Sequence, residues 1–509
     1  MTEVVRIENI TKTFGTVTAN RDVCLDVRRG EILALLGENG SGKTTLMNML
    51  SGIYFPDSGK IYINGEEVVI RSPRDAFALG IGMVHQHFKL VDVLTAAENI
   101  VLGMPGGLLV NRDETAKKIL EISDKYGFII DPWKKIYNMS VSEKQTVEII
   151  KVLYRGAEIL ILDEPTAVLT PQEIDKLFDV LRKMKDDNKA VIIITHKLGE
   201  VMVLSDRVSI MRKGECVDTV PTPDATVQSL AEGMVGRALS LSIKRKEPEN
   251  ATDKLVVSGL TCLDPTGRRT LDGVSFTLRT GEIMGVAGIA GSGQKELCES
   301  LTGLQSIHSG AVTYIGDDGG KTELAGLTPS EVTGKGIRIA FVPEDRLGMG
   351  LVGNLDMVEN MMLKSYRRAK GIWVDRKTPK AAAVKLIEKL QIVTPGTAAP
   401  VRRMSGGNVQ KVLLGREIQS EPSVLVVAYP TRGLDINSSY TVYDLLNEQK
   451  ENGVAVMFAG EDLDVLLELC DRILVLCGGK VSGIVDARTV TKEEIGVLMT
   501  HLSKREDAV

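Results

Sequence analysis

The sequence has few cysteines and no long apolar run. Its six cysteines are scattered over 509 residues without a CxxC pair, which argues against a zinc site, an iron–sulfur cluster or a disulfide scaffold. Apolar runs reach only about six residues, far below the ~20 needed to cross a bilayer. The N-terminal stretch MTEVVRIENI has no basic region followed by an apolar core, so we expect no signal peptide.

An excess of positive charge is also missing. The chain has 62 Lys and Arg against 67 Asp and Glu, a net charge of −5, and this gives no global basic field for nucleic acid or anionic lipid. Apolar residues make up 43% and charged residues 25%, as in ordinary globular proteins. At about 150 residues per domain, we expect a cytosolic protein of two to four domains without a nucleic-acid partner.

The chain contains two copies of one domain. Residues 29–65 match residues 280–316 in order, and SDRVSIMRKGECV at 205–217 matches CDRILVLCGGKVS at 470–482. A repeat of 251 to 265 residues is too long for a solenoid unit and indicates a duplicated domain. Residues 240–254 are polar without periodic apolar spacing, which is typical of a linker. We therefore predict domains at 1–239 and 255–509, joined by a linker at 240–254.

Short apolar runs alternate with helix-length segments in each copy. Residues 32–36, 159–162 and 191–194 are continuous Val, Ile, Leu and Ala runs, as found in buried parallel strands. Each run is followed by a Gly-rich or polar loop and a helical pattern. The expected fold is α/β, with a mostly parallel sheet and ligand chemistry at the carboxyl ends of its strands.

A glycine-rich loop follows the first of these strands and precedes a helical pattern, the context that a phosphate-binding loop requires. Its glycines allow backbone N–H groups to surround phosphate oxygens, and the next helix directs its positive N-terminus at them. The lysine supplies a charge toward the β- and γ-phosphates, and the first threonine completes a magnesium shell. The loop and the helix start comprise Gly37, Glu38, Asn39, Gly40, Ser41, Gly42, Lys43, Thr44 and Thr45.

Two later strands end in residues suited to catalysis. The run 159–162 ends in Asp163 and Glu164, and the run 191–194 ends in Thr195 and His196. Because the chain turns at the strand end, Asp163 can lie near the magnesium while Glu164 faces an attacking water. Taken alone, such a carboxylate pair is usually exposed to water at the edge of a sheet. A single histidine at this position is more often structural than catalytic.

The order of these motifs resembles an ABC-type ATPase over nearly the whole chain, twice. Gln86 stands in place of the Q-loop, residues 140–145 in place of the signature motif and His196 in place of the switch. The resemblance implies two tandem P-loop ATPase domains, each with a helical signature subdomain, that bind ATP and Mg²⁺. It also implies that Gln86 contacts the magnesium and the lytic water, and His196 the γ-phosphate. Phe14 is placed either to stack on adenine or to lie in the core.

The second copy lacks the residues that bind phosphate and metal. Lys43, Thr44, Asp163, Glu164, Gln86 and His196 align with Gln294, Lys295, Ala428, Tyr429, Glu344 and Glu461. Losing the phosphate charge, the metal carboxylate and the candidate base together should abolish hydrolysis. The glycines persist, so weak nucleotide binding stays open.

The signature motifs are degenerate in the opposite copy. The second copy reads Ser405, Gly406, Gly407 and Asn408, with Asp435 in its D-loop, whereas the first has Ser140 to Glu143 without glycine and Thr170 in place of the aspartate. In the family, two domains close head to tail around ATP. The resemblance therefore implies one working composite site, in which Ser405, Gly406, Gly407, Asn408 and Asp435 complete the first copy's nucleotide site.

Within the family, the chain resembles the energy-coupling subunit of an importer. Residues 82–88, 95–103, 162–173 and 427–435 are similar to the nucleoside branch, and the alternative is a monosaccharide importer. A soluble tandem-ABC translation factor is the alternative of another class, but such factors usually keep two intact sites and a long basic linker. Ser142 and Thr146 depart from the branch, which usually has Gly and a basic residue there. His85 and His87 have metal-like spacing but lack further ligands, and we expect them to shape the Q-loop.

The resemblance implies separate membrane partners. We expect two non-identical transmembrane permease subunits, an extracytoplasmic solute-binding protein, and a peripheral position on the cytoplasmic face of the cell membrane. Residues 87–103 and their counterpart 348–363 are rich in Leu, Val and Met and would receive the permeases. Equally, these stretches could be ordinary buried helices.

Overall fold

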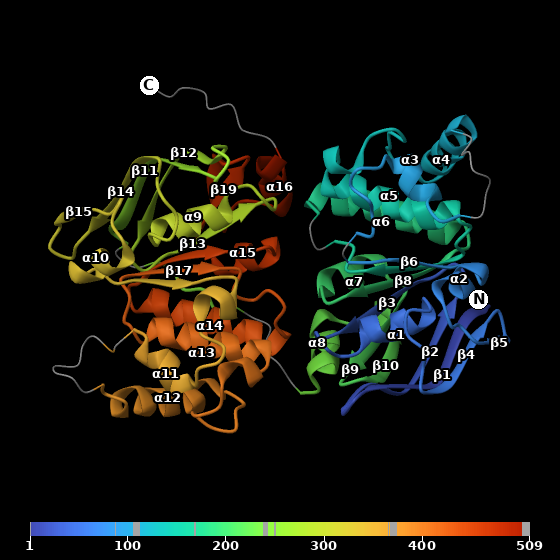
Figure 1. Cartoon of the computed structure of the whole chain (residues 1–509), viewed down its shortest axis with the longest axis horizontal. Helices are drawn as coiled ribbons and strands as arrows, with labels where there is room; N and C mark the ends of the chain where they lie inside the picture. Colours follow the sequence, from blue (N-terminus) through green and yellow to red (C-terminus); the bar gives the residue numbers. More distant parts are fainter. Residues whose placement is uncertain are drawn as a thin grey trace. The chain divides into compact units, whose positions relative to one another are not determined.

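The chain divides into two units, and each unit has its own pair of sheets. The computed structural model describes residues 2–86, 88–104, 112–166, 169–237, 243–248, 251–364, 366 and 374–500. Unit 1 comprises Met1–Ser240 and unit 2 Leu241–Val509 (Figure 1). Among the described residues, each unit has a six-stranded sheet and a four-stranded sheet. The predicted α/β fold, present twice, is confirmed.

The six-stranded sheet of unit 1 has the order β10-β9-β3-β8-β7-β6. It is parallel from β9 to β6, and β10 pairs antiparallel with β9 at one edge. The three predicted strands are its centre, and their side chains are buried because both faces of the sheet are covered. The strands are β3 (Ile32–Gly37), β6 (Ile81–Val84), β7 (Ile159–Asp163), β8 (Ala190–Thr195), β9 (Arg207–Arg212) and β10 (Glu215–Pro221).

A second, antiparallel sheet in unit 1 was not predicted from the sequence. It has the order β2-β1-β4-β5 and comprises β1 (Glu3–Phe14), β2 (Val17–Arg28), β4 (Ser58–Ile63) and β5 (Glu66–Val68). Register shifts interrupt the pairing of β1 with β2 near Ile7 and Ile10. Such irregularities break the strict alternation of apolar and polar residues that would identify a strand in the sequence.

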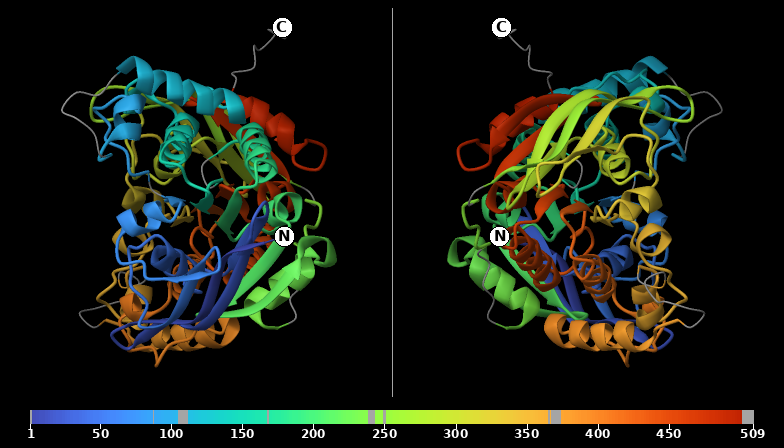
Figure 2. Two further views of the ribbon diagram at one scale, coloured as in Figure 1. Left: turned by 90° about the vertical axis from the view of Figure 1, so that its right-hand side faces the viewer. Right: turned by 90° about the vertical axis from the view of Figure 1, so that its left-hand side faces the viewer.

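The helices of unit 1 cover the two faces of its parallel sheet differently. Leu33 and Leu35 of β3 pack in one cluster with α1 and the antiparallel sheet, whereas Ile32 packs with α5 and α6 on the opposite face (Figures 1 and 2). A smaller cluster joins α3, α4 and α5 into a helical subdomain. The helices are α1 (Lys43–Leu50), α2 (Pro73–Ala78), α3 (Ala96–Val101), α4 (Arg112–Tyr126), α5 (Val141–Tyr154), α6 (Pro171–Asp186), α7 (Leu198–Leu204) and α8 (Val227–Val235).

Unit 2 repeats this architecture. Its six-stranded sheet has the order β16-β17-β18-β13-β19-β20 and its antiparallel sheet the order β12-β11-β14-β15. The strands are β11 (Asp253–Leu263), β12 (Arg269–Arg279), β13 (Ile283–Gly288), β14 (Ser309–Ile315), β15 (Lys321–Glu323), β16 (Ile339–Val342), β17 (Val424–Ala428), β18 (Ala455–Ala459), β19 (Arg472–Cys477) and β20 (Lys480–Asp486). The helices are α9 (Gln294–Leu301), α10 (Pro329–Gly334), α11 (Met357–Met362), α12 (Lys377–Leu390), α13 (Gly406–Ile418), α14 (Ile436–Glu451), α15 (Leu463–Leu469) and α16 (Lys492–Thr500).

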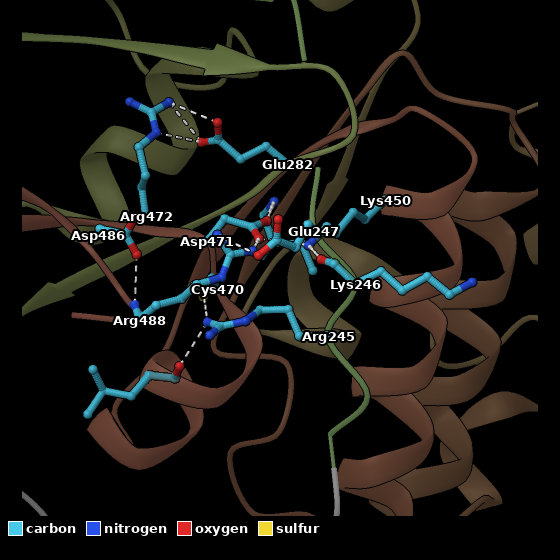
Figure 3. Close-up of polar contacts among 12 residues, drawn as sticks. Arg245, Lys246, Glu247, Glu282, Lys450, Cys470, Asp471, Arg472, Asp486 and Arg488 are labelled. Atoms are coloured by element: carbon cyan, nitrogen blue, oxygen red, sulfur yellow. Dashed lines mark hydrogen bonds and ion pairs between the residues drawn. The ribbon is translucent and has the colours of Figure 1, made fainter. Parts of the chain in front are cut away.

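Part of the predicted linker lies against unit 2. The guanidinium of Arg245 donates to the main-chain carbonyls of Leu467 and Cys470, and Lys450 Nζ donates to the carbonyl of Lys246 at 2.6 Å (Figure 3). The same Lys450 forms a buried ion pair with Asp471 at 2.8 Å. Residues 243–248 are therefore held by hydrogen bonds, while 240–242 and 249–250 lie outside the described residues.

The end of the predicted linker needs a correction. Asp253 and Lys254 belong to strand β11. Lys254 is buried, and its ammonium nitrogen lies 4.9 Å from the centre of the Tyr314 ring and pairs with Asp317 at 2.6 Å. Charged residues at a strand start resemble a linker in the sequence, since the partners that permit their burial are far along the chain.

Candidate functional site

Glycines allow the phosphate-binding loop to pass close to its neighbours. The loop joins β3 to α1, and Gly40 and Gly42 have φ values of 81° and 98°, which favour glycine. A Cβ on Gly42 would lie 2.4 Å from the carbonyl oxygen of Ala19, and one on Gly37 would lie 2.4 Å from that of Met211. Side chains at these positions would displace the main chain, so the glycines are structurally required.

Lys43 lies over the loop that precedes it. Its Nζ donates to the carbonyl oxygens of Gly37 and Glu38 at 2.7 and 2.9 Å. Burial lowers the pKa of this ammonium, although Glu164 and Asp163 act in the opposite direction. The charge is thus held by main-chain oxygens at the N-terminus of α1, where it can reach a bound phosphate.

The strand end separates the two carboxylates as expected. Asp163 is the last residue of β7, and its Oδ2 accepts a hydrogen bond from the Thr44 hydroxyl at 3.3 Å. Glu164 then adopts a left-handed φ of 46°, and its N–H donates to the carbonyl of Ile194. This turn directs the two side chains to different partners.

The two carboxyl groups have opposite pKa shifts. Burial raises the pKa of Asp163 to about 6, with a further increase from the charge of Glu164. A hydrogen bond from His196 lowers the pKa of Glu164, against the effect of burial. Glu164 therefore stays ionised to a lower pH than Asp163.

Three motifs that are distant in the sequence meet at Glu164. Gln86 Nε2 donates to Glu164 Oε2 at 2.8 Å, and His196 Nδ1 lies 2.8 Å from Glu164 Oε1. The three residues follow β6, β7 and β8, which are adjacent strands. Both carboxylate oxygens thus have a partner, and the group is oriented as a general base would need to be.

Phe14 lies at the end of β1 and is 43% exposed. The alternative that it is a core aromatic is therefore wrong. The ring of Tyr54 packs edge-on against it at 5.1 Å between centroids, and Lys12 Nζ lies 5.5 Å from the ring. Tyr54 was not identified from the sequence, because its contact with Phe14 spans forty residues.

The residues near Asp163 suit a magnesium ion bound together with phosphate. The Thr44 hydroxyl and the Asp163 carboxylate are oxygen ligands of the kind that Mg²⁺ prefers, with substrate phosphate and water completing its shell. The buried Ser41 Oγ has no hydrogen-bond partner in the structure, as expected for a loop built to receive an oxyanion. The described residues contain no group of three or more His, Cys, Asp or Glu that could hold a metal alone. His85 is half-buried, and His87 lies outside the described residues.

Unit 2 keeps the shape of this site without its charges. Gln294 occupies the start of α9, and its amide donates to the carbonyl of Ile289 at 3.3 Å, much as Lys43 contacts Glu38. Ala428 ends β17, and Tyr429 has a φ of 47°, nearly that of Glu164. Burial raises the pKa of the Tyr429 phenol, so this side chain stays neutral.

The two signature helices differ at their N-termini. In unit 1 the Ser140 hydroxyl accepts from the N–H of Glu143, and the Glu143 carboxylate accepts from the N–H of Ser140. This capping box occupies the start of α5 and places there a carboxylate, which pairs with Lys134 at 2.6 Å. The pattern Ser-Val-Ser-Glu is visible in the sequence, but the capping box that it forms was not predicted.

In unit 2 the N-terminus of α13 has no side-chain cap. The Ser405 hydroxyl accepts from Asn408 Nδ2 at 2.9 Å, and Asp435 caps the next helix, α14, by accepting from the N–H and hydroxyl of Ser438. A Cβ on Gly407 would lie 2.5 Å from the Ser438 hydroxyl. Signature and D-loop thus pack directly on each other in this unit.

The stretches expected to receive permeases are divided between core and surface. Helices α3 and α11 bury most of their apolar side chains, so the alternative of ordinary buried helices is correct for them. The exposed apolar residues lie in the adjacent loops and helix ends, at Val91, Val93, Leu102, Leu347, Met349, Val352 and Leu363. Among the described helices, none combines the length and the apolar character that a membrane span requires.

The chain is similar to known proteins over nearly its whole length. The family model described as ABC transporter matches residues 20–167 and 271–432. The chain is 41% identical to the guanosine import ATP-binding protein NupO of Bacillus subtilis, covering 99% of each protein. It is 40% identical to the nucleoside import ATP-binding protein NupA of Lactococcus lactis subsp. cremoris, covering 97% of this chain and 98% of that protein.

A sugar-importer relative is almost as similar. The ribose import ATP-binding protein RbsA 1 of Streptomyces avermitilis is 38% identical, with 97% of this chain and 93% of that protein covered. Each match extends over both units. The chain therefore belongs to the ABC transporter family and carries two of its ATPase domains.

Proposed function

We propose that the chain is the ATP-hydrolysing subunit of a nucleoside importer. Two relatives with 40 and 41% identity over nearly the whole chain are named for nucleoside and guanosine import. The motifs around Gln86 and Asp163, which resemble the nucleoside branch, support the same substrate class. A monosaccharide importer is the second candidate, because a ribose-import relative reaches 38% identity.

The observation that carries the ATPase assignment is the contact of Gln86 and His196 with the two oxygens of Glu164. In the proposed mechanism Glu164 accepts the proton of the attacking water. Lys43 and the N-terminus of α1 bind the β- and γ-phosphates, and Phe14 stacks on the adenine. Thr44, Asp163 and Gln86 would hold Mg²⁺, which when bound neutralises charge on the phosphates.

We further propose that unit 2 completes this site in the ATP-bound state. Ser405, Gly406, Gly407 and Asn408 would approach the γ-phosphate, with Asp435 beside them. The uncapped N-terminus of α13 supports this role, since it offers N–H groups and a positive helix end to an anion. In unit 1 the capping box of Ser140 and Glu143 already occupies the start of α5, which opposes the same role for that helix.

The remaining partners are proposed from the family. Two non-identical permease subunits would bind the loops that carry Val93 and Met349, since the apolar side chains there differ between the units. An extracytoplasmic solute-binding protein would deliver the substrate. In this arrangement the chain is peripheral, on the cytoplasmic face of the cell membrane.

The test is ATP hydrolysis by the chain with its co-purifying membrane partners and solute-binding protein. Nucleosides should stimulate turnover and monosaccharides should not. Stimulation by a monosaccharide alone would show that the importer takes up a sugar, which is the second candidate. Full activity without any membrane partner, together with co-purification of ribosomes, would contradict the transporter function.

A further inference from the structure

A charged cluster in unit 2 occupies the place of the Glu164 network. The group at its centre is a cation instead of an anion. In unit 1 a central carboxylate contacts Gln86 and His196. In unit 2 the aligned residues are Glu344 and Glu461, and the guanidinium of Arg432 contacts both of them. Its Nη1 pairs with Glu344, and its Nε lies 3.2 Å from Glu461 Oε1. A central anion with two donors is thus replaced by a central cation with two acceptors.

The main chain around Arg432 is also fixed. Its carbonyl oxygen accepts a hydrogen bond from the guanidinium of Arg346, and its N–H donates to the carbonyl of Tyr429 at 3.3 Å. Tyr429 in turn donates its N–H to Ala459 at the end of β18. Arg432 therefore connects the loops that follow three strands of the sheet, β16, β17 and β18.

The segment that Arg432 contacts leads directly to the apolar loop of unit 2. Arg346 begins a single π-helical turn, Arg346–Gly350, whose first N–H groups are capped by Asp345. The exposed Leu347 and Met349 lie in this turn. Contacts that hold residues 344–346 in place therefore also position these two apolar side chains.

We propose that Arg432 is a positioning residue that holds the loop after β16 against the loop after β18 without any nucleotide. Without it, Glu344 and Glu461 would place two negative charges at one site and repel each other. The aligned residue in unit 1 is Ala167, which has no charge to play this part. Unit 2 therefore keeps one loop conformation through the ATP cycle. This inference goes beyond the proposed function and holds even if the transported substrate is different.

Hydrogen–deuterium exchange of the full chain without nucleotide tests the contact. Arg432→Ala should speed exchange at residues 343–350 by about two- to fivefold, as expected for loss of a partly exposed ion-pair network. The matched control is Arg338→Ala, which removes an arginine from an exposed pair with Glu421 at the other end of β16. That variant should leave residues 343–350 unchanged. Equal exchange in Arg432→Ala and the unchanged chain would overturn the proposal.

A double-mutant comparison separates the ion pairs from general loosening. In a chain with Glu344→Gln and Glu461→Gln, the further change Arg432→Ala should have little effect on this segment. An undiminished effect there would show that the carboxylates are not the partners, against the proposal. If Arg432→Ala fails to fold, Arg432→Lys carries the same test. Its ammonium cannot bridge both carboxylates as the guanidinium does, so a smaller increase in exchange is expected, and no increase would overturn the proposal.

Independence from nucleotide is tested by adding Mg–ATP. Exchange should fall in the peptide that contains Gln86 and stay constant at 343–350. An equal fall in both peptides would contradict the proposal for unit 2. A fall in neither would instead contradict the proposed ATP site of unit 1, so the two failures are distinguishable.

Discussion

Glu164 combines an unusual backbone with two side-chain partners. Its φ of 46° is rare for a residue with a side chain, and the contacts with Gln86 and His196 fix the carboxylate at the end of β7. Tyr429 repeats the backbone at φ 47° without the carboxylate. The strained turn therefore belongs to the fold, and the chemistry depends on the side chain placed there.

Replacing Glu164 with Gln should leave ATP binding intact and lower hydrolysis by about 10²- to 10⁴-fold, because the amide cannot accept the proton of water. Single-turnover hydrolysis and equilibrium ATP binding measure the two effects separately. Glu158→Gln is the matched control, since Glu158 lies just before the opposite end of β7, beside Lys189. Near-normal turnover in Glu164→Gln would show that another group is the base.

Asp163 should make the metal-free chain less stable at neutral pH. Its pKa of about 6 in the folded chain exceeds the ordinary 3.8. The folded state therefore binds more protons than the unfolded state between these values, and the free energy of unfolding falls as pH rises through this window. In EDTA, Asp163→Asn should raise the free energy of unfolding at pH 8 by about 1–3 kcal/mol.

Thermal melts at several pH values check this prediction. The stabilisation by Asp163→Asn should shrink as the pH falls from about 6 toward 4, where the folded aspartate is protonated. A benefit that is constant over this range would mean that the carboxyl does not titrate there. The same variant should lose Mg-dependent hydrolysis, because the amide is a poorer metal ligand.

At the scale of single elements, the contrast between α5 and α13 is the clearest difference between the units. Both helices follow a serine, yet Ser140 caps its own helix and Ser405 does not. The loss of Gly407 in unit 1, where Ser142 is aligned, removes the close packing on the D-loop. Three substitutions thus distinguish the self-capped start of α5 from the uncapped start of α13.

Gly407→Ala should damage this element. Its Cβ would lie 2.5 Å from the Ser438 hydroxyl and 3.2 Å from Asp435 Oδ2, and relieving such overpacking costs about 1–3 kcal/mol. If the displaced α13 end binds the γ-phosphate, ATP turnover should drop roughly ten- to hundredfold. Ser142→Ala in unit 1 is the matched control and should retain turnover. Equal loss in both variants would contradict the assigned difference.

The sequence predicts the central strands of each parallel sheet, and the elements and contacts that it does not predict have physical reasons. The runs 32–36, 159–162 and 191–194 became β3, β7 and β8 because parallel strands covered on both faces are continuously apolar. The antiparallel sheet around β1 escaped notice because register shifts break its alternation. The contacts of Arg432 and Tyr54 could not be foreseen, since they join loops that approach only in the folded chain.

For the whole molecule, the two units have one fold and different chemistry. The same strand order holds Lys43, Asp163, Glu164 and His196 in unit 1 and uncharged or acidic residues in unit 2. The sequence showed this difference directly, because strand ends fix where each motif lies. The sequence could not show that the Arg432 guanidinium lies beside Glu461, nor that residues 243–248 are hydrogen-bonded to helices of unit 2.

We propose that one composite site hydrolyses ATP, with the phosphate loop from unit 1 and the signature from unit 2. The most direct measurement is ATP turnover of the assembled transporter carrying Lys43→Ala, Gln294→Ala, Ser405→Ala or Ser140→Ala. We predict that Lys43→Ala and Ser405→Ala lose at least about 100-fold, whereas Gln294→Ala and Ser140→Ala stay close to the unchanged protein. Loss of turnover in Gln294→Ala or Ser140→Ala to the same extent, or retention in Ser405→Ala, would show that ATP is not hydrolysed at this single composite site.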